Sequence, residues 1–364
     1  MEEIATLSHL DAALLLRHQR TGDPADLADA ERHARRVLRL AGEDHPERAL
    51  FLSTLAAVLR TRFDQGGESS ADEIVRLAEE AVRRSPRVVP LWSRRLSALA
   101  DALSLRYEVT GAFADLRESI AVLRAAVEDC PATHPEYPAY RFNLGVGLFT
   151  RYLRNGAAAD LDEAVSACRE AVQRTPPGHV RRPGLEAHLA VILRARHTAT
   201  GRREDLDEAI RLATRAAAEL DAPNPRRAWT VSLLSLLHGG RYQLLGDPAD
   251  LAEAVRLGRA ALAATPYGRR DRVVVVNNLV TVLVMGEEDG DLAVELAREA
   301  AGRAEQAHES LAALAVALIR QARRTGEKAL WDEASASLRA ASRSATAPVS
   351  GRVDAALAWA SLEV

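Results

Sequence analysis

Apolar side chains in residues 135–178 recur at the spacing of two successive α-helices. The first apolar run is Phe142, Val146, Phe149 and Leu153, and the second is Leu161, Val165, Cys168 and Val172. Steps of three or four residues place apolar side chains on one face of a helix. Gly156 lies between the runs and Pro176 follows them; glycine readily ends a helix in the left-handed conformation, and proline cannot continue one. The segment therefore predicts a first helix, a loop and a second helix, which we call helix A and helix B.

The start of helix B carries a polar signal of its own. Asp160 and Glu163 stand three residues apart before the second apolar run, in the order of a capping box. We therefore predict that Asp160 is the N-cap residue of helix B. The acidic pairs in this first turn, Asp162 with Glu163 and Asp207 with Glu208, are explained by the helix dipole, which favours negative charge there, without any role in acid–base catalysis.

The same helix pair returns about every 45 residues along the chain. A fixed period of about 20–50 residues indicates a stack of repeats, and no β pattern interrupts it. We predict an all-α protein, an α-solenoid or right-handed superhelix of about eight stacked helix pairs that forms a single domain over residues 1–364. The predicted units are residues 2–40, 46–85, 90–130, 135–176, 180–220, 225–265, 270–302 and 303–345.

Residues 351–364 open one more apolar helix, which has no partner helix after it. One interpretation is a terminal capping helix, as solenoids need at their ends. The other is the first helix of a truncated unit in a longer protein. The sequence pattern fits both.

Two sets of positions recur with the repeat and are predicted to be structural. The first set is an arginine near the end of each helix A: Arg17, Arg62, Arg106, Arg151, Arg196 and Arg241. A cation suits the carboxyl end of a helix, and we expect these side chains to pair with a carboxylate at the start of helix B. An arginine stripe that binds an acidic ligand is the alternative. The second set is small and should lie where helices approach most closely: Ala164, Ala171, Ala209, Ala216, Ala254 and Ala261.

Charge and composition exclude several classes of partner. The net charge is −3, which provides no basic stripe for nucleic acid. The first residues lack the basic and apolar regions of a signal peptide, and no apolar run is long enough to span a membrane. Two cysteines cannot form a disulfide framework. We predict a cytoplasmic protein that binds neither nucleic acid nor membrane.

The histidines could in principle bind a metal ion, but several of them recur at the same position of the repeat, which favours a structural role. His18 and His197 occupy the aromatic slot that follows the recurring arginine, and His45, His134 and His179 share the slot of Asn224 before helix A. Positions that recur with the repeat are expected to be structural. No HExxH or paired-cysteine spacing is present. We therefore predict no metal site and no cofactor.

The cysteines give no stronger signal for catalysis. Cys168 falls on a small packing position, which predicts a buried and inert thiol. Cys130 and His134 are four residues apart, but the loop between them provides no recognisable oxyanion donors. A thiol without a basic neighbour is weakly nucleophilic. We predict no catalytic residue and therefore a protein that is not an enzyme.

Helix B resembles that of tetratricopeptide repeats (TPR). Ala164, Cys168, Ala171 and Pro176 keep that family's steps of four, seven and twelve residues, and Leu144-Gly145 looks like its Leu-Gly pair in helix A. The units are longer than the standard TPR unit. This long variant, with Arg-Tyr, Thr-Gly and Asp-Leu-Asp-Glu-Ala, resembles the repeat arrays of actinobacterial proteins that carry a caspase-like CHAT protease domain. The chain itself contains no such α/β domain.

The resemblance implies that helix A lines a concave groove that binds a protein or peptide. Aligned on Leu144-Gly145, the partner-binding positions are Phe142, Val146, Phe149, Trp229, Ser232, Leu236, Asn277 and Thr281. The groove is expected to be apolar and small-sided in its middle, and not cationic. The alternative is that Phe142 and Phe149 pack against the neighbouring unit.

The resemblance favours a non-catalytic interaction scaffold, such as the sensing or regulatory arm of a CHAT-type protease system with the protease in cis or in trans. One alternative is the interaction arm of a transcriptional or signalling regulator, which the same repeats also accompany. A small-ligand receptor or an enzyme that uses the lumen of the solenoid is a further alternative. The sequence makes no prediction of oligomeric state.

Overall fold

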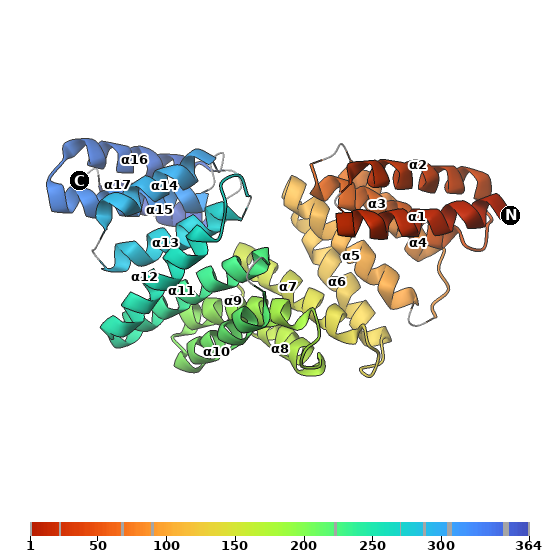
Figure 1. Ribbon diagram of the computed structural model, residues 1–364, viewed down its shortest axis with the longest axis horizontal. Coiled ribbons are helices and arrows are strands. Elements are labelled where there is room, and N and C mark those ends of the chain that lie inside the picture. The colour runs from red at the N-terminus through yellow and green to blue at the C-terminus, as the bar shows by residue number, and fades with distance from the viewer. Residues whose placement is uncertain are drawn as a thin grey trace. The chain divides into compact units, whose positions relative to one another are not determined.

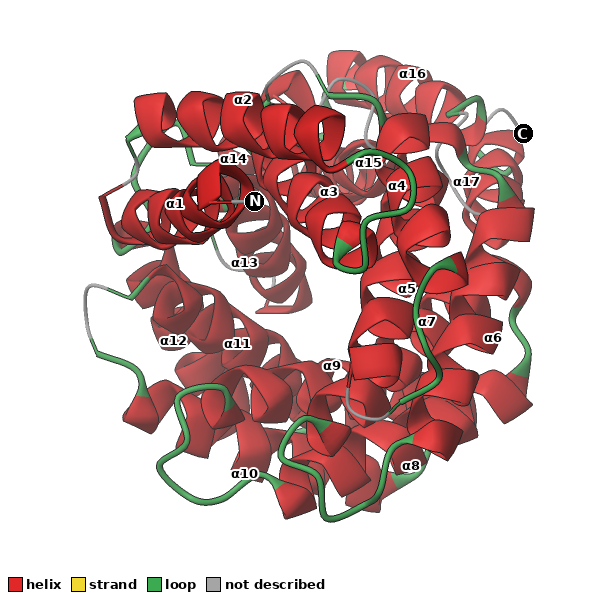
Figure 2. Cartoon of the chain, turned by 90° about the vertical axis from the view of Figure 1, so that its right-hand side faces the viewer, coloured by secondary structure: helices red, strands yellow, loops and turns green. Residues whose placement is uncertain are grey.

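A computed structural model describes residues 2–21, 23–66, 69–88, 91–221, 224–269, 271–286, 289–303, 308–344 and 349–362. Every regular element in these ranges is an α-helix, and no strand occurs among them (Figures 1 and 2). The protein is thus an all-α α-solenoid, as predicted. None of the described helices is long and apolar enough to cross a membrane. The fold divides into two compact units, Met1–Arg151 and Tyr152–Val364, which we describe separately.

Unit 1 contains three packed helix pairs and most of α7. Its helices are α1 (Glu2–Thr21), α2 (Pro24–Ala41), α3 (Arg48–Asp64), α4 (Ala71–Arg83), α5 (Leu91–Thr110), α6 (Phe113–Asp129) and α7 (Tyr137–Asn155). The B helices α2 and α4 each pack on their own A helix and on the next one: α2 contacts α1 and α3, and α4 contacts α3 and α5. Leu59, Ile74 and Leu103 are fully buried in a core that joins α3, α4 and α5.

Unit 2 continues the same arrangement. Its helices after α7 are α8 (Ala158–Arg174), α9 (Arg182–Thr200), α10 (Arg203–Glu219), α11 (Pro225–Leu245), α12 (Pro248–Ala263), α13 (Arg272–Gly286), α14 (Gly290–Arg303), α15 (His308–Thr325), α16 (Lys328–Ser342) and α17 (Val349–Ala360). The A helices α11, α13 and α15 pack side by side. Leu279, Leu283 and Leu318 lie in the core that joins α13 to α15.

The predicted end of helix A at Gly156 is confirmed, since Gly156 follows α7 with φ of 70°, and the equivalent glycines end other A helices in the same way. Gly111, Gly201 and Gly246 follow α5, α9 and α11 with φ of 70°, 71° and 71°, the left-handed region that favours glycine. The amide of Gly201 donates to the carbonyl of His197, which closes the last turn of α9. Gly22, the corresponding residue after α1, lies outside the described residues.

The predicted start of helix B is wrong by three residues. Helix α8 begins at Ala158 with Ala157 as its N-cap, so Asp160 stands inside the first turn. In α2 and α12 the capping residues are Asp23 and Asp247, whose carboxylates accept from the backbone two residues later. The recurring aspartate is buried, as at Asp160, and it faces helix A in the pairs described below.

The recurring small residues lie in the core. Relative exposure is at most 1% for all six of these alanines, Ala164, Ala171, Ala209, Ala216, Ala254 and Ala261. Side chains of this size let α8, α10 and α12 approach their neighbours closely. Larger side chains at these positions would have to displace a packed helix.

Candidate partner-binding groove

The recurring arginines form ion pairs with the buried aspartates of helix B. The guanidinium of Arg106 donates to both carboxylate oxygens of Asp115 at 2.8 and 2.7 Å. Arg196 binds Asp205 in the same bidentate way, at 2.8 and 2.6 Å. Arg17 also pairs with Asp26, and Arg241 with Asp250. The expected pairing is therefore present at Arg17, Arg106, Arg196 and Arg241.

The same arginines also contact the preceding B helix. Arg196 lies 3.1 Å from Asp162 on α8, and Arg106 lies 3.4 Å from Asp72 on α4. Arg62 has no aspartate nine residues later and pairs with Glu31 on α2. One arginine thus joins its own helix pair to the previous one, a contact that the sequence did not predict.

The ion pairs change the titration of their members. Hydrogen bonds from Arg241 hold the pKa of Asp250 below its ordinary value, and His238 acts in the same direction. Hydrogen bonding to Arg17 likewise lowers the pKa of Asp26. Guanidinium groups held in this way serve the packing of the repeat, so we do not assign these arginines to an anionic ligand.

The recurring histidines have structural contacts as well. Nδ1 of His45 and of His134 accepts the backbone N–H two residues later at 3.1 Å, and His179 does the same at 3.2 Å. Asn224 makes the equivalent contact through its amide oxygen at 3.0 Å. These side chains therefore order the turn before helix A.

The histidines of the aromatic slot bind backbone carbonyls. Nδ1 of His18 lies 2.6 Å from the carbonyl of Asp23, and Nδ1 of His197 lies 2.8 Å from that of Arg202. Among the residues that the structure describes, no group of three metal-ligating side chains could hold a metal ion.

Cys130 is not arranged as a nucleophile. Its side chain is buried, and burial raises the pKa of the thiol. The neighbouring His134 uses Nδ1 to accept the amide of Glu136. Cys168 is fully buried in α8.

The residues predicted for the groove fall into different environments. Phe142, Val146 and Phe149 are half-buried on α7. Trp229 is half-buried on α11, where its ring lies against His188 with the centroids 5.5 Å apart. Leu236 is half-buried on the same helix.

Three further predicted residues link or flank the A helices of unit 2. Ser232 is fully buried and accepts a hydrogen bond of 2.9 Å from Asn278 on α13, so it contacts a helix and not solvent. Asn277 donates to Ser310 on α15, also at 2.9 Å. Thr281 is exposed.

Thr281 lines a cavity of about 490 Å³ on the A helices of unit 2. We call this cavity the α13–α15 groove. Its lining residues are Gln243 of α11, Val280, Thr281, Val284 and Met285 of α13, and His308, Glu309, Ala312, Ala313, Val316 and Arg320 of α15. The walls are mostly apolar, with valine and alanine side chains, and Arg320 adds a cation at the α15 end.

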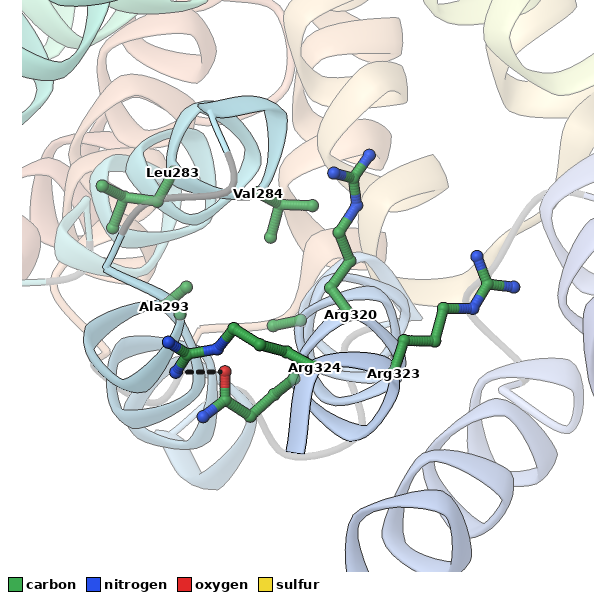
Figure 3. Close-up of a pocket in the computed structure, with 9 residues that line it drawn as sticks. Leu283, Val284, Ala293, Arg320, Arg323 and Arg324 are labelled. Carbon is green, nitrogen blue, oxygen red and sulfur yellow. Dashed lines mark hydrogen bonds between the residues drawn. The ribbon is translucent and has the colours of Figure 1, made fainter. Parts of the chain in front are cut away.

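A second cavity, of about 460 Å³, adjoins the groove. It shares Val284 and Arg320 with the groove and extends to α14 at Ala293. Figure 3 shows the side chains of Arg320, Arg323 and Arg324 extending from α15 in different directions, with the end of Arg324 on the same side as Ala293. The two cavities together place apolar walls next to an arginine-rich helix end.

The sequence already distinguishes the carboxyl end of α15 from the ends of the earlier A helices. Counting back from Thr325-Gly326, as from Thr200-Gly201, places Gln321 in the slot of Arg196. The amide of Gln321 donates to Asp291 on α14, the preceding B helix. The eighth unit thus has glutamine where other units have arginine, with three arginines beside it at positions 320, 323 and 324.

Comparison with known proteins supports the fold. No protein-family model and no curated protein matches the sequence. A solved tetratricopeptide repeat protein from Parabacteroides merdae covers 85% of this chain and 99% of its own, with a TM-score of 0.52 and 12% identity. The chain thus shares the fold of TPR proteins, and an identity this low indicates nothing about its ligand.

Two further solved structures are similar over a smaller part of the chain. The nearly identical TPR-like repeats of a kinesin light chain from Podosopora anserina cover 64% of this chain and 97% of their own, with 18% identity and a TM-score of 0.41. BtubC from P. vanneervenii covers 74% of this chain and 94% of its own, with 16% identity and a TM-score of 0.42. We draw no argument from scores below 0.5.

Proposed function

We propose that the protein is a non-catalytic scaffold that binds a segment of a partner protein in the α13–α15 groove. The groove is built from three A helices of a repeat fold, and its walls carry valine, alanine and methionine side chains. Recessed apolar surface of this kind suits an extended peptide or one face of a helix.

The observation that carries the proposal is the exposure of apolar side chains inside the cavity. Val316 is 46% exposed although it lines the groove, and the neighbouring Val284 and Met285 are only half-buried. Apolar surface that is both contiguous and recessed commonly marks an interaction site. The recurring arginines, in contrast, are occupied by contacts within the repeat.

The finer proposal is that this scaffold is the regulatory arm of a CHAT-type protease system in the cytoplasm. Its support is the resemblance of the long repeat, with Arg-Tyr, Thr-Gly and Asp-Leu-Asp-Glu-Ala, to the arrays of such proteins. The encoding genome provides the test. A Cys/His protease domain after residue 364 or in the adjacent reading frame is the expected result, and a DNA-binding segment there would favour a transcriptional regulator instead.

Site-specific photocrosslinking tests the groove itself. A benzoylphenylalanine at position 316 should crosslink a defined protein in cells of the source organism, because the side chain faces the proposed segment. The matched control carries the same group at Val109, a valine on α5 that is 56% exposed. The same crosslinked species from both positions, or none from position 316, would refute binding in the groove.

A further inference from the structure

We infer that the partner segment is acidic and that its carboxylates face the last turns of α15. This inference rests on the proposed function, since it concerns the occupant of the α13–α15 groove. It starts from the arginines at positions 320, 323 and 324, of which Arg320 lines both cavities and all three line the second. All three side chains are exposed.

The described charges around the groove favour an acidic occupant. Arg324 lies 3.5 Å from Asp291 and donates to Gln321 at 3.1 Å, so one carboxylate offsets part of the cluster. At the other end of α15, Glu309 lies within electrostatic reach of Arg194 on α9. Among the charged residues that line the two cavities are three arginines, at positions 320, 323 and 324, and one carboxylate, Glu309.

The directions of the arginine side chains indicate a segment and not a small anion. In Figure 3 the side chains of Arg320, Arg323 and Arg324 diverge from α15 and do not meet at one point. A phosphate or a single carboxylate needs donors that converge on it. Divergent cations instead fit carboxylates spaced along a chain. Glu309 and Arg320 are eleven residues apart on α15, which at the rise of a helix is about 16 Å, the length of about five extended residues.

The repeat fold does not require this cluster. Cations near the carboxyl end of a helix are stabilised by the helix dipole, and this explains one basic residue in a last turn. Yet α5, α11 and α13 have no basic residue in the last turn, whereas α15 has Arg323 and Arg324 there and Arg320 one turn earlier. The structural arginine slot of this unit holds Gln321, so none of the three arginines occupies that slot.

Three fluorescein-labelled peptides of twelve residues test the inference with the full chain. The peptides share leucines at every third or fourth position and carry glutamate, lysine or glutamine elsewhere. Fluorescence anisotropy should show the tightest binding for the glutamate peptide, and added salt should weaken that binding because the charges are exposed. Arg320→Glu/Arg323→Glu should weaken it at least about tenfold and make the lysine peptide the preferred one, since like charges repel and opposite charges attract across an interface.

A matched charge reversal controls for the change in net charge. Arg203→Glu/Arg211→Glu alters two exposed arginines on α10 and should leave the order of the three peptides unchanged. Equal binding of all three peptides, no binding of any, or no effect of the α15 reversal would overturn the acidic segment. The crosslink at position 316 separates the two proposals. A crosslinked partner whose binding ignores both salt and the α15 reversal leaves the scaffold standing and refutes the acidic segment.

Discussion

At the residue scale, one slot of helix B shows how neighbouring residues set the size of a side chain. The slot holds Leu123 in α6, Cys168 in α8 and Gly258 in α12, and all three are buried. A Cβ at Gly258 would lie 2.8 Å from Cδ1 of Leu279 and 2.9 Å from Oγ of Ser235. Ser235 is held in place because its hydroxyl donates to the carbonyl of Ala254 at 2.6 Å. Only glycine fits this slot in α12 without a shift of its neighbours.

Gly258→Ala should therefore be destabilising relative to the same change at Gly302. Alanine is favoured over glycine in a helix by about 1 kcal/mol, and an added Cβ at Gly302 meets no described atom within 4 Å. At Gly258 the same preference for alanine is opposed by overpacking, which should make Gly258→Ala less stable than Gly302→Ala by about 1–3 kcal/mol. Urea unfolding of the two variants measures the difference. Equal stabilities would mean that α12 and α13 do not approach as closely as the structure shows.

A second residue-scale feature is an acidic side chain in the core of unit 1. Asp11 of α1 is buried, and its Oδ1 lies 3.6 Å from Nδ1 of His33 on α2. Neither atom has a hydrogen-bond partner among the described residues. Burial raises the pKa of Asp11 to about 7, and burial together with Arg32 and Arg36 lowers the pKa of His33. The fold thus favours the neutral form of both groups.

Asp11→Asn should stabilise the protein at pH 8 and do so less at pH 5. The folded state holds the proton of Asp11 more tightly than the unfolded state does. The stability that protonated Asp11 contributes to the wild type is therefore complete below about pH 4 and is lost as pH rises through about 7. The free energy of unfolding of the variant should exceed that of the wild type by roughly 2–4 kcal/mol at pH 8. His33 is present in both proteins, so the comparison isolates Asp11.

Urea unfolding of both proteins at several pH values provides the measurement. Asp44→Asn is a suitable control, since Asp44 is exposed in the turn after α2. A stability gap that does not change with pH would show that Asp11 is ionised in the folded protein.

At the element scale, the arginine–aspartate pairs explain how each helix pair is joined to the one before it. Arg196 lies near the carboxyl end of α9, binds Asp205 in the first turn of α10 and contacts Asp162 of α8. The side chain of Asp205 is 5% exposed. Removing one partner of such a pair leaves a buried charge without compensation, which is more costly than losing an exposed pair.

Arg196→Met should destabilise the protein by roughly 3 kcal/mol, because Asp205 stays buried without its cation. Arg203→Met is the matched control on the next helix. Arg203 and Asp207 are exposed members of an ion pair within one helix turn, and such pairs contribute about 0.5 kcal/mol or less. Thermal or urea unfolding should separate the two variants clearly. Similar small losses for both would show that the arginine slot does not hold the repeats together.

At the scale of the whole molecule, the repeat period and the compact units do not coincide. The period of about 45 residues continues through the boundary at residues 151 and 152, which lies inside α7. Within unit 2, the A helices α11, α13 and α15 pack side by side and form the groove. The groove lies largely in the last two predicted units, and the eighth of these has Gln321 in the slot that holds arginine in units one to six.

Much of the fold followed from local sequence signals, because these depend on residues close in the chain. Helical spacing located the helices, and Gly111, Gly201 and Gly246 marked the ends of A helices by their left-handed backbone. The N-cap of helix B was misplaced because Asp160 resembles a capping residue but lies inside the helix. Its repeat equivalents bind an arginine about nine residues earlier, a contact between helices that a local motif does not describe.

The sequence by itself determined the helices, the carboxyl ends of the A helices, the repeat and the slots that recur with it. Only the tertiary structure decided which A-helix positions are accessible, since that depends on residues of neighbouring helices. Ser232 and Thr281 were predicted alike for the groove, yet Asn278 covers the first and the second lines the cavity. Arg320 joined the site because α15 packs beside α13. The local sequence pattern specifies each helix, whereas the exposure of a side chain depends on how the neighbouring helices pack around it.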